Sequence, residues 1–283
     1  MWAFHRLSTL KDFLNRQRAE GRSIGFVPTM GALHEGHLSL IRRSKDAQEV
    51  AICSIFVNPT QFNDPTDLLK YPRTEAEDLY LLHQTGCAAA FLPSEPEVYP
   101  AGQGVGPDFR FGVLDKTMEG EFRPGHFKGV AQVVHRLLQM VEPDSIYMGQ
   151  KDFQQVAIVR EMIKQANLPV RLVMCPTARE ENGLAMSSRN VRLSGAQRSR
   201  AALIYEMLQD VRARAHGDNL PALEVEALQR LRGEPGFRPE YFSVVDGKTL
   251  QPVRSLADSD YVVVCVACWV GDVRLIDNLI IKE

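Results

Sequence analysis

A doubly wound parallel α/β sheet followed by a smaller α+β domain is the fold class that the sequence predicts. Short continuous apolar runs alternate with helical patterns up to about residue 175, which is typical of parallel strands covered on both faces by helices. After Pro176 the pattern changes to a polar loop, a long helical stretch and β-branched runs. The length of 283 residues also suits two domains. We therefore predict a Rossmann-like domain over residues 1–176 and a smaller C-terminal lid domain over residues 177–283.

The first domain opens with an apolar stripe from Trp2 to Leu14, which predicts a helix that ends near Gly21. Residues 93–112 are rich in Pro and Gly and predict a loop. Apolar runs of strand length predict strands over residues 24–27, 50–57, 88–92, 145–148 and 170–175. Apolar residues at helical spacing predict helices from residue 36, over 74–84, over 130–141 and through 156–159.

The C-terminal part has a different pattern. Residues 195–232 predict helix with an interruption near Gly217. Three β-branched runs predict strands over residues 241–245, 261–270 and 273–281. The Gly271-Asp272 pair between the last two runs suits the turn of an antiparallel hairpin. This part is therefore predicted to pack helices on a small antiparallel sheet.

Composition and charge exclude several classes of protein. Lys and Arg number 33 and Asp and Glu number 35, so the net charge of −2 does not indicate a nucleic-acid or membrane-surface partner for the chain as a whole. The apolar run 261–270 is too short to span a bilayer, and the N-terminus lacks the layout of an export signal. We expect a soluble, cytoplasmic protein. Cys265 and Cys268 have the spacing of a metal pair, but residues three apart on a strand point to opposite faces, so we predict core cysteines.

The loop after the first buried strand carries the strongest chemical signal. Ligands of open α/β sheets bind at the carboxyl ends of strands. There the sequence runs Met-Gly-Ala-Leu-His-Glu-Gly-His over residues 30–37 and leads into a helix. Gly31 and Gly36 let the backbone approach a ligand, the helix N-terminus attracts anions, and His34 and His37 add donors. This arrangement favours phosphate chemistry, although a metal pair or two capping histidines would give the same spacing.

Four further segments follow predicted strands or precede predicted helices. Asn58 and Gln61 offer neutral amides suited to a small hydroxylated substrate, or an Asn-capped turn. Residues 123–129 form a basic segment that is either an ordinary surface loop or faces an anion. Lys151 follows a strand and a glycine, where it would act as a point charge on phosphate oxygens. Residues 187–189 place two hydroxyls and an arginine in one turn, which can wrap a triphosphate or lie on the surface.

The His-Glu-Gly-His segment resembles the HIGH signature of the nucleotidylyltransferase superfamily, and residues 186–190 resemble its KMSKS-type loop. Seven motifs between about residues 24 and 278 resemble the pantoate–β-alanine ligase (pantothenate synthetase) family in order and spacing: TMGALHEGH, FVNPTQF, YPRT, RPGHFKGV, GQKDFQQ, GLAMSSRN and RLIDN. The resemblance implies ATP-dependent condensation of pantoate with β-alanine to pantothenate, AMP and pyrophosphate through a pantoyl adenylate. It also implies Mg²⁺ and a homodimer.

The resemblance assigns roles to individual residues. His37 is implied as the proton donor, and charge on the phosphates is stabilised by His34, Lys151, Ser187, Ser188 and Arg189. ATP binding is implied for Met30, Gly31, Ala32, Leu33, His34, Glu35, Gly36, His37, Gly149, Gln150, Lys151, Asp152, Ala178, Met186, Ser187, Ser188 and Arg189. Substrate binding is implied for Gln61, Gln155, Asn58, Tyr71, Arg123 and His126. An acidic pair, Glu77 and Asp78, is implied to hold Mg²⁺.

Two departures and two alternatives accompany this assignment. The family usually has Glu where Gln150 stands and Val where Ala178 stands, and both changes bear on the affinity for ATP. A nucleotidylyltransferase acting on a phosphorylated substrate would want cations in place of the neutral amides at Asn58, Gln61 and Gln155. A nucleotide-binding relative without catalysis would be expected to lack His34, His37 or Lys151, and the sequence has all three.

Overall fold

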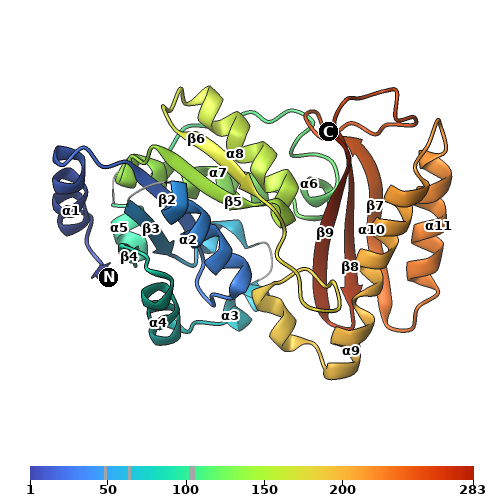
Figure 1. The fold of residues 1–283 in the computed structure, drawn as a ribbon, viewed down its shortest axis with the longest axis horizontal. Coiled ribbons are helices and arrows are strands. Elements are labelled where there is room, and N and C mark those ends of the chain that lie inside the picture. Colours follow the sequence, from blue (N-terminus) through green and yellow to red (C-terminus); the bar gives the residue numbers. More distant parts are fainter. Residues whose placement is uncertain (48–49, 63–64, 102–105) are drawn as a thin grey trace. The chain divides into compact units, whose positions relative to one another are not determined.

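The computed structural model describes residues 1–47, 50–62, 65–101 and 106–283, and the chain divides into two compact units (Figure 1). The first unit comprises Met1–Phe111, Gly125–Gln150 and Ile158–Pro176. The second comprises Gly112–Pro124, Lys151–Ala157 and Thr177–Glu283. The units therefore differ from the predicted limits 1–176 and 177–283 by two short segments, 112–124 and 151–157.

Within its described residues, the first unit is built on one parallel six-stranded sheet with the strand order β1-β4-β3-β2-β5-β6. Its strands are β1 (Trp2–Phe4), β2 (Ile24–Thr29), β3 (Val50–Ile55), β4 (Ala89–Phe91), β5 (Ser145–Gly149) and β6 (Arg171–Cys175). The order reverses direction at β2, because β3 lies on one side of it and β5 on the other. The predicted Rossmann-like fold class is confirmed, and β2 stands at the topological switch point where such sheets bind ligands.

Helices cover both faces of this sheet (Figure 1). They are α1 (Leu7–Ala19), α2 (Glu35–Ala47), α3 (Pro65–Lys70), α4 (Glu75–Thr85), α5 (Glu95–Val98), α7 (His126–Val141) and α8 (Phe153–Gln165), with the 3₁₀ helix η1 (Pro59–Gln61). Helix α2 contacts β2, β3 and β5 and packs beside α4, while α7 packs beside α1. The predicted loop over 93–112 contains α5, and its residues 102–105 lie outside the described residues.

The helix predicted from the N-terminal stripe is shorter than expected. Residues Trp2–Phe4 form β1 at the edge of the sheet, in parallel register with β4, and α1 begins only at Leu7. The Phe4 ring still packs on the Phe13 ring of α1, with centroids 5.4 Å apart. A strand and a helix thus share an apolar stripe that a single helix would also produce.

The second unit has a three-stranded antiparallel sheet in the order β7-β8-β9, formed by β7 (Phe237–Asp246), β8 (Val262–Val270) and β9 (Val273–Lys282). Its helices are the short α6 (Glu119–Phe122), α9 (Gly195–Arg200), α10 (Leu203–Arg214) and α11 (Leu220–Arg232), with the 3₁₀ helix η3 (Ser188–Arg192). The predicted hairpin turn is confirmed, with Gly271 at φ +58°. The single interrupted helix predicted over 195–232 is three helices, the first starting at a capping box between Ser194 and Gln197.

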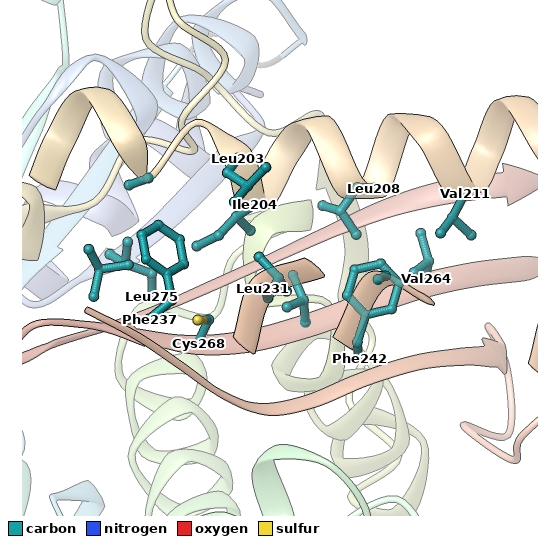
Figure 2. Close-up of a cluster of buried hydrophobic side chains, with 14 of the residues drawn as sticks. Leu203, Ile204, Leu208, Val211, Leu231, Phe237, Phe242, Val264, Cys268 and Leu275 are labelled. Atoms are coloured by element: carbon teal, nitrogen blue, oxygen red, sulfur yellow. The ribbon is translucent and has the colours of Figure 1, made fainter. Parts of the chain in front are cut away.

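One face of the β7-β8-β9 sheet packs against α10 and α11 to form the apolar core of the second unit (Figure 2). Alternate residues of β8, from Val262 to Val270, point into this core, and Cys268 is among them. Cys265 is equally buried but lies outside that cluster, and it faces the side of the sheet that carries Glu119. The prediction of two core cysteines on opposite faces is confirmed.

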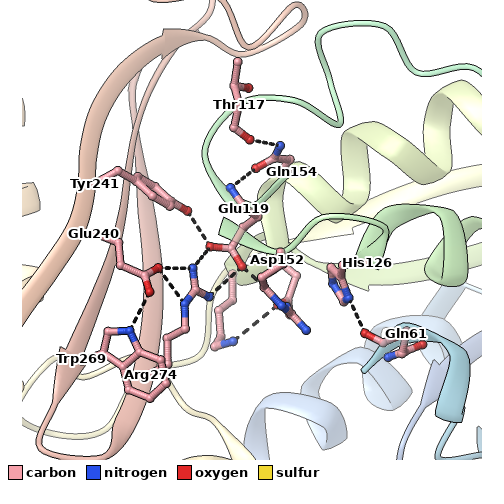
Figure 3. Close-up of polar contacts among 12 residues, drawn as sticks. Gln61, Thr117, Glu119, His126, Asp152, Gln154, Glu240, Tyr241, Trp269 and Arg274 are labelled. Carbon is pink, nitrogen blue, oxygen red and sulfur yellow. Dashed lines mark hydrogen bonds and ion pairs between the residues drawn. The ribbon is translucent and has the colours of Figure 1, made fainter. Parts of the chain in front are cut away.

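The other face of this sheet binds segments 112–124 and 151–157 (Figure 3). Buried Glu119 of α6 forms two hydrogen bonds with Arg274 of β9, 2.6 and 2.8 Å long. The Tyr241 hydroxyl donates to the same carboxylate at 2.9 Å. The Gln154 side chain donates to the carbonyls of Leu114 and Thr117 and accepts from the Glu119 N–H. These long-range contacts explain why both segments belong to the second unit despite their place in the chain.

Candidate active site

The loop between β2 and α2 holds an unusual backbone path. Gly31 has φ +78° and Ala32 has φ +49°. A Cβ at Gly31 would lie 2.9 Å from Asp78 Oδ2, so only glycine fits there. A positive φ at alanine costs about 1–3 kcal/mol and persists only where surrounding contacts impose it. This loop is therefore held in place by its neighbours.

Asp78 of α4 supplies that constraint. Its carboxylate is buried and accepts from the Ala32 N–H at 3.0 Å, from the Leu33 N–H at 2.7 Å and from the Thr74 hydroxyl at 3.2 Å. The adjacent Glu77 is exposed, because consecutive helical residues point about 100° apart. Both Asp78 oxygens therefore bind the loop and Glu77 points elsewhere, so this geometry gives no support to the Mg²⁺ pair, which stays a prediction. The described residues also contain no group of three or more His, Cys, Asp or Glu side chains arranged to hold a metal.

The two histidines lie together at the start of α2, with ring centroids 4.1 Å apart. The Gly36 N–H donates to His34 Nδ1 at 3.1 Å, and the His34 N–H donates to His37 Nδ1 at 3.4 Å. An Nδ1 that accepts from a backbone N–H carries no proton, so the neutral tautomer of each ring has its proton on Nε2. The Nδ1 atoms therefore act as acceptors for backbone N–H groups, as the alternative of two capping histidines predicted. In its neutral form each ring is then left with Nε2 as a donor.

Asn58 precedes η1 and Gln61 is its last residue. Asn58 is buried, caps the turn, and donates through Nδ2 to Thr60 Oγ1 at 2.9 Å. The Asn-capped turn left open by the sequence is therefore what the structure contains at Asn58. Gln61 is half-buried, with Nε2 3.0 Å from Met30 Sδ, so it lies against the first residue of the 30–37 loop. Nearby Tyr71 is buried, and its ring meets Phe62 at 5.8 Å.

Helix α7 supports η1. It begins at His126, earlier than the predicted residue 130, and His126 Nδ1 lies 2.8 Å from the backbone oxygen of Gln61. A Cβ at Gly129 would lie 2.5 Å from the Thr60 carbonyl oxygen, so glycine allows α7 and η1 to approach closely. Arg123 belongs to the second unit, where its Nη1 atom lies 3.6 Å from Glu119 Oε2.

Residues 149–155 cross from one unit to the other. Gly149 and Gln150 end the β5 segment of the first unit, whereas Lys151 and Asp152 belong to the second. Lys151 Nζ lies 3.5 Å from Asp152, and the Lys151 carbonyl accepts from Asn278 Nδ2 at 2.9 Å. Gln155 is half-buried on α8. The predicted phosphate cation Lys151 is thus positioned by the C-terminal sheet.

Residues 178–190 form a compact loop of the second unit. A bridge joins Arg179 to Ala185, and the Met186 N–H donates to the Ala178 carbonyl at 3.0 Å. Ser187 caps η3 by accepting from the Arg189 N–H at 3.3 Å. Residues 186–189 are half-buried. The loop therefore has a defined shape that presents two serines and an arginine together.

Sequence reasoning named Asp78 and the RLIDN motif but missed the role of their side chains in holding these loops. Asp78 anchors the 30–37 loop, and Asp277 with Asn278 anchors two segments of the second unit. The signal available for the second pair was two polar residues inside the otherwise apolar strand VRLIDNLIIK.

A family model of pantoate-beta-alanine ligase matches residues 3–280. The chain belongs to this family. A pantothenate synthetase of Bacteroides thetaiotaomicron is 48% identical over 283 residues, covering 100% of both chains. One from Porphyromonas gingivalis is 47% identical over 282 residues, covering 99% of each.

Solved structures of pantoate–β-alanine ligases are also similar to this chain. The pantothenate synthetase of Thermus thermophilus has a TM-score of 0.92 at 37% identity, with 100% of each chain covered. A Francisella tularensis pantoate-beta-alanine ligase, complexed with Beta-gamma ATP and Beta-alanine, has a TM-score of 0.78 at 34% identity, covering 100% of this chain and 98% of that one. The predicted family, fold class and ligase activity are confirmed. In the described residues, no helix is long and apolar enough to cross a membrane.

Proposed function

We propose that this enzyme joins pantoate to β-alanine in two steps, adenylation of pantoate by ATP and then amide formation. The observation that carries the proposal is the 30–37 loop at the switch point of the sheet, where backbone N–H groups donate to Nδ1 of two imidazoles at a helix N-terminus. The Francisella tularensis relative, complexed with an ATP compound and β-alanine, supports these co-substrates. Pantoate follows from the family.

In the first step a pantoate carboxylate oxygen attacks the α-phosphorus of ATP, the bond to the bridging oxygen breaks, and pyrophosphate leaves with the electron pair. His37 Nε2–H donates a hydrogen bond to the leaving oxygens as their charge builds, and His34 Nε2–H stabilises the spreading negative charge. Lys151 acts as a point charge on the phosphates, while Ser187, Ser188 and Arg189 supply hydroxyl and guanidinium donors. Each imidazole suits this role in its neutral form, because it presents an Nε2–H donor without needing a second proton.

In the second step the β-alanine amine attacks the acyl carbon of the pantoyl adenylate, and AMP leaves. Gln61 and Gln155 hold pantoate hydroxyls without adding charge, and Gln61 sits beside Met30, whose thioether suits the dimethyl group of pantoate. The mixed anhydride must be protected from water, which is the task we assign to residues 177–283 as a lid.

Magnesium fits this scheme as a companion of the ATP phosphates rather than as a resident ion. Mg²⁺ bound with nucleotides keeps several waters and needs few protein carboxylates. The pair Glu77 and Asp78 does not fit it, because the Asp78 oxygens hold the 30–37 loop. We derive no step through the ion.

An omission series followed by mass spectrometry tests the function. Protein is incubated with ATP, Mg²⁺, pantoate and β-alanine, and each component is left out in turn. We expect pantothenate and AMP only in the complete mixture, and enzyme-bound pantoyl adenylate when β-alanine is missing. ATP binding without product at any protein concentration would overturn the proposal. We also propose a cytoplasmic homodimer on family grounds, and light scattering on the purified protein gives the mass that decides the oligomer.

A further inference from the structure

Two consecutive polar residues, Asp277 and Asn278, interrupt the apolar strand β9. Both are buried, with 4% and 2% of their surface exposed. Neighbouring side chains of a strand point to opposite faces. Asp277 shares the helix-covered face with Leu275 and Leu279, and Asn278 shares the opposite face with Arg274. One dipeptide thus reaches segments on both sides of the sheet.

On the helix-covered side, Asp277 binds Arg179 through two hydrogen bonds of 2.6 and 3.0 Å. The guanidinium of Arg179 stacks 3.7 Å over the Tyr205 ring and donates to the Gly183 carbonyl at 3.1 Å. Burial raises the pKa of Asp277, and the charge of Arg179 offsets this only in part. A buried carboxylate with this partner is costly to disturb, so the loop of residues 178–186 is held at Arg179.

On the opposite side, Asn278 Nδ2 donates to the Lys151 carbonyl at 2.9 Å. Burial is the main influence on the pKa of Asp277, and the charge of Lys151 lowers that pKa. The Asn278 N–H in turn donates to Asp277 Oδ1 at 2.8 Å. The two side chains are therefore joined to each other as well as to their loops.

We infer that Asp277 and Asn278 are positioning residues that hold Lys151 and the 186–189 loop at a fixed separation for the ATP phosphates. This inference rests on the proposed function of those segments. Neither Asp277 nor Asn278 is proposed to touch substrate. Their effect is to fix, before ATP binds, the geometry of donors that lie far apart in the chain.

The two reaction steps should respond differently to the loss of this contact. Adenylation needs the donors around the triphosphate, whereas pyrophosphate has left before the amine attacks. The Asn278→Ala enzyme should therefore lose kcat/KM for ATP in pantoate-dependent pyrophosphate–ATP exchange by about 10- to 100-fold. Its conversion of supplied pantoyl adenylate with β-alanine should change by less than about 3-fold.

Three variants make the test specific. Asn278→Gln keeps an amide donor and should restore part of the exchange rate, whereas Asn278→Asp removes the donor and should not. Arg179→Lys keeps the charge but loses the paired hydrogen bonds, so it should also slow pyrophosphate–ATP exchange more than it slows amide formation. This variant provides the test if Asn278→Ala does not fold. Ser259→Ala removes a hydrogen bond to Asp246 elsewhere in the second unit and should leave both steps unchanged.

The outcomes separate this inference from the proposed function. An equal fall in both steps together with a lower melting temperature would show a structural role only and overturn the inference. Unchanged exchange in Asn278→Ala would also overturn it while leaving the function intact. A wild-type enzyme without exchange or product would overturn the proposed function, and the positioning role with it.

Discussion

The carboxylate of Asp78 accepts the backbone N–H of Leu33 through a 2.7 Å hydrogen bond, 45 positions away in the chain. The same side chain accepts the N–H of Ala32, the residue with positive φ in the loop before the two histidines. An acidic side chain at the start of α4 therefore fixes the backbone that precedes His34. This relationship gives Asp78 a role distinct from metal binding.

We expect Asp78→Asn to lower the free energy of unfolding by about 1–3 kcal/mol, because an amide cannot accept both backbone N–H groups and one is left buried and unpaired. The loop relaxes, so turnover should fall by about 10-fold or more while the dependence on Mg²⁺ concentration stays unchanged. Urea unfolding measures the free energy of unfolding, and a Mg²⁺ titration of turnover measures the dependence on Mg²⁺. Glu77→Gln is the matched control and should change neither. A raised Mg²⁺ requirement in both variants would restore the metal pair.

His37→Ala should slow adenylation by about 100-fold or more while the protein remains folded, because the ring supplies an Nε2–H donor and only a weak cap of 3.4 Å to the backbone. Stopped-flow or exchange measurements of adenylate formation, with circular dichroism for the fold, report the two effects separately. His83→Ala changes an exposed histidine of α4 and serves as the control. Turnover close to wild type in His37→Ala would remove His37 from the mechanism.

Local patterns predicted most of the fold because they record burial. Strands β2 to β5 and β8 bury nearly continuous runs of residues, and these mostly apolar runs are visible in the sequence. The edge strand β1 is only three residues long, and its aromatic residues also fit the stripe of α1. The start of α7 was placed late because Gly125 at φ +83° is the N-cap before His126, and a positive φ cannot be read from a glycine alone.

The sequence indicated candidate site segments but not the contacts that hold those segments in place. The loops after β2 and β5 carry their chemistry within a few residues, so their composition indicates phosphate binding. The residues that hold them act over long separations: Asp277 binds Arg179 across 98 positions, and Asn278 binds Lys151 across 127. No periodicity relates such partners. The two hydrogen bonds that Asp78 accepts from the 30–37 loop likewise depend on how α4 packs. The adjacent acidic residues Glu77 and Asp78 do not reveal that packing in the sequence.

Gly129→Ala should destabilise the protein by about 1–3 kcal/mol, because the added Cβ would overlap the Thr60 carbonyl and force η1 away from α7. Gln61 lies on η1, so we expect a higher KM for pantoate with a smaller change in KM for ATP. Gly195→Ala is the control, since nothing lies within 4 Å of its Cβ position. Steady-state kinetics with each substrate varied in turn measures the two KM values. Equal changes in the two KM values would argue against a link between η1 and pantoate.

The Glu119–Arg274 pair should make the stability of the second unit depend on acid. Burial alone would raise the pKa of Glu119, but the hydrogen bonds and charge of Arg274, with Arg123 and Tyr241, hold it below its ordinary value of 4.5. A carboxylate whose pKa is lowered on folding contributes its full stability above 4.5 and loses it as the pH falls through the folded pKa.

Glu119→Gln should therefore cost on the order of 3 kcal/mol at neutral pH, because it leaves the buried Arg274 with one anionic partner fewer. The difference from wild type should shrink progressively below pH 4.5, where the wild-type carboxylate also becomes neutral. Urea unfolding across that pH range measures the difference in stability. Tryptophan fluorescence can follow the unfolding, because Trp269 hydrogen-bonds Glu240 of the same network. Glu226→Gln changes a half-exposed partner of Arg214 and should cost less than about 1 kcal/mol at any pH. A cost for Glu119→Gln that does not vary with pH would show that shape, and not charge, holds segment 112–124 on the sheet.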